Sequence, residues 1–155
     1  MLKQLGSRMC FVCGSVNPIG LHLEFWMDDE QVWTDFTAGP EHQGYPGVMH
    51  GGLVATILDE IMGRAAALKK LWMFTAKMEI AYRKPVPLGQ PLRAVSRIDE
   101  MRGSRMLASA HIQLPDGTTA VEGHGLYLPV PEEQMGRFLD DLRQQGVDVS
   151  GYVRT

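Results

Sequence analysis

The chain has 155 residues, of which 45% are hydrophobic and 21% are charged. This composition fits one globular domain and excludes a chain that is disordered as a whole. The formal net charge of −3 argues against a protein that binds nucleic acid through bulk positive charge. No apolar run approaches the roughly 20 residues of a membrane helix, and the first residues lack the apolar stretch of a signal peptide. We therefore expect a cytoplasmic protein with neither nucleic acid nor membrane as its partner.

Two short strands are predicted first, over residues 21–26 and 32–36, because apolar and polar side chains alternate there. Residues 38–49 contain three glycines and two prolines, which predicts a loop. Between Gly52 and about Lys69 the apolar period changes to 3.6 residues, which predicts one long helix. Its broad apolar stripe consists of Leu53, Val54, Ile57, Leu58, Ile61, Met62 and Ala65.

Four further strands are predicted after this helix, over residues 76–82, 92–100, 106–114 and 118–128. Short turns with glycine separate the last three strands and are typical of β-hairpins. A second helix should begin at Pro131 and end at Gly146, with an apolar face formed by Met135, Phe138, Leu139 and Leu142. A curved antiparallel sheet can bury one broadly apolar helix on one face. The elements therefore predict an α+β fold with about six strands wrapped around one long central helix.

His50, Gly51 and Gly52 stand at the start of the long helix. Glycine in the first turn of a helix costs roughly 0.8–1 kcal/mol relative to alanine, so its use suggests that something approaches the backbone closely. Free N–H groups at a helix N-terminus can stabilise a developing negative charge, such as a carbonyl oxygen that becomes an oxyanion. A turn that simply needs glycine is the alternative interpretation.

Asp59 lies two turns further along, roughly 150° from the centre of the apolar stripe and among small residues. It has no basic residue three or four positions later, whereas Glu60 can pair with Arg64. Asp59 is therefore a candidate functional carboxylate, with a solvated helix residue as the alternative.

Together these residues resemble the PaaI-like hotdog-fold acyl-CoA thioesterases of the 4-hydroxybenzoyl-CoA thioesterase superfamily. The signature is His50-Gly51-Gly52 with an aspartate nine residues after the histidine. The resemblance covers roughly residues 10–128. Within this range, the segments 42–47 and 75–89 also resemble the family, and residues 10–21 resemble a subset of it. The expected organisation is an N-terminal segment over 1–20, a hotdog thioesterase domain over 21–130, and a C-terminal helix and tail over 131–155.

The resemblance implies roles for individual residues. Asp59 would be the catalytic carboxylate, acting as a nucleophile or as a general base on water. The Gly51 N–H would polarise the thioester carbonyl, His50 would border the thioester, and Thr75 would position water or Asp59. Gly52 and Gln43 are expected at the substrate. Some family members carry an asparagine where this chain has Gly44, and Gln43 is the candidate to replace that amide.

The implied reaction is hydrolysis of an acyl-CoA thioester to a carboxylic acid and coenzyme A, with no metal and no separate cofactor. The family also implies a homodimer with shared active sites, and beyond it a dimer of dimers, that is, a homotetramer. His50 and Asp59 are about 13 Å of helix rise apart, too far to hold the same thioester carbon on one chain. A non-catalytic acyl-CoA or lipid-binding hotdog module, and a hydratase or dehydratase on the same fold, are the alternatives.

Two further sets of residues have open interpretations. Because coenzyme A carries several phosphates, Arg83, Arg102 and Arg105 are candidate contacts, with ordinary surface charge as the alternative. Cys10 and Cys13 form a single Cys-x-x-Cys motif, which is only half of a four-ligand zinc site. His22 and His42 could complete the set, but neither has a convincing spacing. Buried packing thiols are therefore favoured over a metal site or a redox pair.

Overall fold

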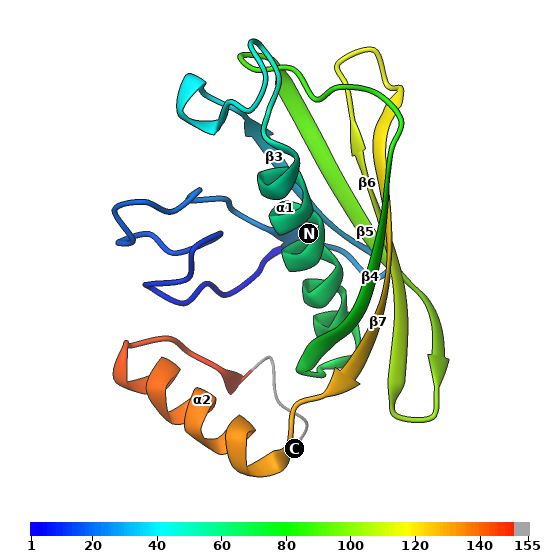
Figure 1. The fold of residues 1–155 in the computed structure, drawn as a ribbon. Helices are drawn as coiled ribbons and strands as arrows, with labels where there is room; N and C mark the ends of the chain where they lie inside the picture. The colour runs from blue at the N-terminus through cyan, green and yellow to red at the C-terminus, as the bar shows by residue number, and fades with distance from the viewer. Residues whose placement is uncertain (151–155) are drawn as a thin grey trace.

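The structure is a computed structural model that describes residues 1–150. One antiparallel sheet of seven strands, in the order β1-β2-β3-β5-β6-β7-β4, curves around the long helix α1 (Figure 1). The strands are β1 (Leu2–Lys3), β2 (Trp26–Met27), β3 (Gln31–Thr37), β4 (Met73–Tyr82), β5 (Pro91–Arg102), β6 (Arg105–Gln113) and β7 (Thr119–Pro129). The helices are α1 (Gly51–Arg64) and α2 (Glu132–Gln144), with short 3-10 helices η1 (Pro40–His42) and η2 (Ala65–Lys69). The predicted α+β fold is confirmed.

Helix α1 packs its apolar stripe against the concave face of the sheet. Its residues Val54, Ile57, Leu58, Ile61 and Met62 are all buried. The helix continues without interruption into η2, so the predicted helical region over 52–69 is confirmed to within one residue.

Small residues on the facing strands let α1 lie close to the sheet. Ala94, Ala108 and Ala110 are buried on β5 and β6, and Gly123 occupies the neighbouring position on β7. A Cβ on Gly123 would come within 3.2 Å of the end of the Met62 side chain, so any larger residue here would require that side chain to shift. The sheet thus fixes the position of the helix that carries the candidate site.

Strand β4 is one edge of the sheet, because within the described residues 1–150 it pairs only with β7. It is ten residues long, and Phe74, Thr75, Ala76 and Lys77 in its first half are exposed. A long edge strand with unpaired backbone groups is a ready surface for pairing with another chain.

The first predicted strand, over residues 21–26, is mostly wrong. Only Trp26 belongs to a strand, whereas His22 has a positive φ of 53°, which interrupts any regular extended ladder. The backbone of 21–25 instead pairs with the N-terminal segment, for example through the Leu21 N–H and the Phe11 carbonyl at 2.8 Å. The alternation of apolar and polar residues still reflects the burial of apolar side chains, since Phe25 is buried. The sheet has one strand more than the roughly six expected, because β1 pairs with β2.

The C-terminal helix α2 begins and ends within two residues of its predicted bounds. Its predicted apolar face is only partly covered, because Leu142 is buried whereas Phe138 is 39% exposed. The Phe138 ring meets Phe74 of β4 edge-on, with ring centroids 6.1 Å apart. Helix α2 therefore packs beside the start of the edge strand. Among the described helices, none has the length and apolarity needed to cross a bilayer.

Candidate active site

Helix α1 begins beside His50, which caps it. The imidazole Nδ1 accepts a hydrogen bond from the Gly52 N–H at 2.9 Å. Because Nδ1 is the acceptor, a neutral His50 ring carries its proton on Nε2. The side chain is exposed, so this Nε2–H is available as a donor at the start of the helix.

Gly51 is the first residue of α1, and its N–H has no acceptor among residues 1–150. A Cβ on Gly51 would meet only the ring of Tyr82, at 3.7 Å, which is an ordinary van der Waals distance. The φ of Gly51 is not positive either. Neither backbone conformation nor packing among residues 1–150 therefore requires glycine here, and the N–H is left without an acceptor in the same residues.

Asp59 and Thr75 lie together, as predicted. The Thr75 hydroxyl of β4 donates a hydrogen bond to Asp59 Oδ1 at 2.6 Å. Asp59 is half-buried, and no ion pair to it is found in the described chain. Glu60 pairs with Arg64 at 2.7 Å, which confirms the contrast that the sequence predicts between the two neighbouring acids. The Asp59 carboxylate is thus oriented by a neutral donor and not neutralised by a cation.

Tyr127 on β7 is a residue of this region that the sequence analysis missed. Its side chain is completely buried, and the phenol oxygen has no properly aligned hydrogen-bond partner in the described residues. Burial raises the pKa of Tyr127, the Asp59 carboxylate raises it further, and the nearby Thr75 hydroxyl opposes the shift. The alternation of β7 predicts that Tyr127 faces inward, but nothing in the sequence connects it to Asp59.

Two separate cavities divide the predicted site residues. Asp59 and Thr75 line a cavity of about 360 Å³. His50, Gly51 and Tyr82 line a second cavity of about 780 Å³ at the other end of α1. Within one chain, the structure therefore brings together the members of each group but keeps the two groups apart.

Residues 46–121 match the family model of the thioesterase superfamily. This part of the chain is a thioesterase-superfamily domain. It includes His50, Gly51, Asp59 and Thr75, that is, every residue to which the resemblance gave a catalytic role.

Relatives of the thioesterase domain include two proteins named acyl-coenzyme A thioesterase THEM4. The Bos taurus protein is 27% identical over 135 residues, which is 85% of this chain and 56% of that protein. The Rattus norvegicus protein is 37% identical over 104 residues, covering 64% of this chain and 45% of that protein. The chain thus spans about half the length of the curated relatives it matches.

Solved structures share the hotdog fold of the thioesterase domain. One thioesterase superfamily protein matches with a TM-score of 0.74 and 29% identity, over 78% of this chain and 60% of that chain. The Escherichia coli PaaI protein matches with a TM-score of 0.67 and 16% identity, over 72% of this chain and 81% of its own. The second match supports the fold alone.

The predicted substrate-binding residues are scattered around the thioesterase domain. Arg83 lines the cavity at the helix start and also pairs with Glu122 at 3.3 Å. Arg102 and Arg105 flank the β5–β6 turn and line neither of the two cavities. Gln43 is exposed, and its side-chain oxygen accepts the Gly47 N–H at 3.0 Å, which stabilises its own loop. A role for these side chains at the substrate stays a prediction.

Cys10 and Cys13 are both half-buried free thiols that line the Asp59 cavity. A hydrogen bond between the two thiols lowers the pKa of Cys10 to about 6. The same hydrogen bond and burial raise the pKa of Cys13. The two histidines considered as further ligands are engaged elsewhere, since His22 Nδ1 bonds to the Gly14 carbonyl and His42 Nδ1 accepts the Gly39 N–H.

Proposed function

We propose that this chain is an acyl-CoA thioesterase, which hydrolyses a thioester to a carboxylic acid and coenzyme A without a metal or a separate cofactor. The observation that carries this proposal is the hydrogen bond from Thr75 to Asp59, which orients a carboxylate that has no cationic partner in the described chain. The proposal is also supported by relatives that are named acyl-coenzyme A thioesterase. Two proteins of the same fold were solved with acetyl-CoA and with coenzyme A.

Each half of the site supplies one part of the hydrolysis. Asp59 accepts a proton from water as the water oxygen attacks the thioester carbon. The free Gly51 N–H donates to the carbonyl oxygen as it becomes an oxyanion, and His50 Nε2–H lies at the same edge of the site. The carbon–sulfur bond then breaks, and the coenzyme A thiolate takes up a proton as it leaves.

Asp59 can act in a second way, as a nucleophile that forms an acyl-enzyme anhydride. The two mechanisms differ in where the new oxygen comes from. A single turnover in ¹⁸O-water puts the label into the product acid when Asp59 acts as a base. When Asp59 acts as a nucleophile and water opens the anhydride at the Asp59 carbonyl, the first product carries the unlabelled enzyme oxygen and the label appears in the enzyme carboxylate, so label in that carboxylate identifies an anhydride.

The reaction requires the two cavities to meet, and a second copy of the chain can bring them together. Strand β4 is an exposed edge, and Thr75 near Asp59 and Tyr82 near Gly51 lie toward its opposite ends. Antiparallel pairing of β4 with its copy reverses one strand, so the Thr75 end of one chain lies along the Tyr82 end of the other. We therefore propose a homodimer with two shared sites, which can pair again into a homotetramer, in the cytoplasm.

A panel of acyl-CoA esters with a thiol-reactive dye tests the proposed activity. Release of coenzyme A by the wild-type chain, and its loss in Asp59→Asn, would support hydrolysis. Tight binding of acyl-CoA without any release by the wild-type chain would instead identify a non-catalytic binding module. That alternative is favoured by position 44, where glycine provides no side-chain amide. Any side chain there would be crowded, because a Cβ would come within 3.0 Å of the His50 Cα.

A further inference from the structure

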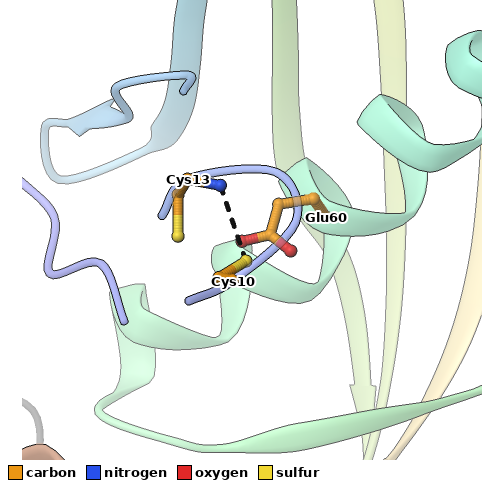
Figure 2. Close-up of side chains that lie close together, drawn as sticks. All are labelled: Cys10, Cys13 and Glu60. Atoms are coloured by element: carbon orange, nitrogen blue, oxygen red, sulfur yellow. Dashed lines mark hydrogen bonds between the residues drawn. The ribbon is translucent and has the colours of Figure 1, made fainter. Parts of the chain in front are cut away.

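Beside the proposed site, three potential metal ligands from two separate parts of the chain converge. Cys10 and Cys13 belong to the N-terminal segment, and Glu60 belongs to α1 (Figure 2). The two sulfur atoms and a carboxylate oxygen all lie within 4.8 Å of one another, and all three residues are half-buried. This is the one such group of three or more ligands among residues 1–150. The sequence showed only its Cys-x-x-Cys half, because the third member is fifty residues away.

The backbone turn that holds the two cysteines is tightly fixed. The Gly14 N–H donates to the Cys10 carbonyl at 2.8 Å, and the Cys13 N–H donates to Cys10 Sγ at 3.5 Å (Figure 2). A Cβ on Gly14 would lie only 2.3 Å from the Cys10 carbonyl oxygen, so this turn requires glycine. Backbone N–H groups that bond to sulfur are the outer contacts that support metal-bound thiolates.

Glu60 is held in place by an outer partner of its own. The Arg64 Nε donates to Glu60 Oε1 at 2.7 Å, and the two side chains are only 14% and 24% exposed. Arg64 is itself anchored to the Leu5 carbonyl at 2.9 Å, and its guanidinium lies 4.2 Å from the centre of the Phe25 ring. An outer-shell residue that orients a ligating carboxylate in this way is typical of protein metal sites.

The charges in this cluster also suit a divalent cation. Two thiolates and the Glu60 carboxylate carry three negative charges, and Arg64 carries one positive charge. A divalent cation bound to the two thiolates and the carboxylate therefore leaves the cluster, together with Arg64, electrically neutral. A neutral cluster avoids the free energy penalty of an unbalanced, partly buried charge.

We propose that Cys10, Cys13 and Glu60 bind one zinc ion through two thiolates and one carboxylate. Zinc accepts both sulfur and oxygen ligands and is usually tetrahedral, so a fourth position remains for water from the Asp59 cavity that both cysteines line. Neither Asp59 nor Thr75 is a ligand, so the ion stands outside the proposed hydrolysis.

The structural consequence is a clamp between the N-terminal segment and α1. Between β1 and β2 the chain runs for more than twenty residues without a helix or strand. Segments of that length without secondary structure are uncommon in compact domains and usually have a function. A zinc ion shared by Cys10, Cys13 and Glu60 would fasten this segment to α1 next to Asp59.

Zinc content and cobalt spectra test the proposal on the full chain, purified with a thiol reductant. We expect about one zinc ion per chain, and Co²⁺ in its place should give thiolate-to-cobalt charge-transfer bands. The double variant Cys10→Ser/Cys13→Ser should lose both signals, and Glu60→Gln should weaken zinc binding in competition with a chromophoric chelator. Glu24→Gln, which removes an exposed carboxylate of the same region, is the matched control and should bind like the wild type.

Thermal unfolding gives a second readout. Zinc at about a hundredfold excess over its Kd should raise Tm by about 5–10 °C in the wild type and leave Tm of the double cysteine variant unchanged. A folded, fully reduced wild-type chain that binds no stoichiometric zinc would overturn the proposal. Equal zinc binding by the double cysteine variant would also overturn it. Neither readout involves thioester hydrolysis, so the outcome is independent of the proposed function.

Discussion

The two ends of the proposed chemistry on α1 differ in what they present. At the start of the helix, His50 caps the Gly52 N–H and leaves the Gly51 N–H free, so this end offers backbone and imidazole donors. Two turns later, Asp59 offers an acceptor that the Thr75 hydroxyl orients. Donors alone stabilise an oxyanion but cannot activate water. The carboxylate alone can activate water but cannot stabilise an oxyanion. One chain therefore carries a donor end and an acceptor end, which line separate cavities.

The largest expected effect comes from the acceptor end. Asp59→Asn preserves size and the hydrogen bond from Thr75 but removes the proton acceptor, so kcat for acyl-CoA hydrolysis should fall by about 10²–10⁴-fold. Asp29→Asn in the exposed acidic turn is the control and should keep wild-type kcat. Near-normal turnover by Asp59→Asn would eliminate Asp59 as base or nucleophile.

The donor end can be removed without breaking the helix. Proline is well accepted at the first helical position, and His50, with ψ of 130°, already has the conformation that precedes proline. Gly51→Pro deletes the free N–H and should lower kcat by about 10²–10³-fold. Gly51→Ala retains the N–H and should lose less activity. Equal losses in the two variants would indicate crowding and not the loss of a donor.

A smaller effect should follow from freeing the carboxylate. Thr75→Val removes the hydroxyl that orients Asp59 and should reduce kcat about 10-fold, as expected for a hydrogen bond to a charged group. Thr75→Ser keeps the hydroxyl and should stay close to the wild type in the same steady-state assay. If valine and serine behave alike, the hydrogen bond does not position Asp59.

The smallest effect on activity is expected from the buried phenol behind the acceptor end. Because the Tyr127 hydroxyl lacks a properly aligned partner in the described chain, Tyr127→Phe should raise the free energy of unfolding by about 1 kcal/mol. Denaturant titration measures this change. A loss of kcat larger than that of Thr75→Val would instead show that the phenol holds the Asp59–Thr75 pair in place.

The helix α1 and the residues at its two ends could largely be predicted from the sequence, because helical periodicity and glycine at the start of α1 are local signals. Asp59 stands out on its helix for the same reason. The partner of a side chain is not a local property, so Tyr127 and the Glu60 contact with the cysteines could not be predicted. The strand over 21–26 is overpredicted because its alternation reflects packing against the N-terminal segment. Alternation with a period of two looks the same in the sequence whether a segment packs against a loop or pairs in a β-sheet.

The central claim is that each active site combines the Gly51 end of one chain with the Asp59 end of another. Mixing Gly51→Pro and Asp59→Asn under conditions that exchange subunits tests it most directly. Each variant alone should be nearly inactive. In an equal mixture about half of the dimers are mixed, and each of these has one intact site of two, so about one quarter of wild-type activity should return. Activity that stays at the level of the separate variants, although the subunits have exchanged, would contradict a shared site.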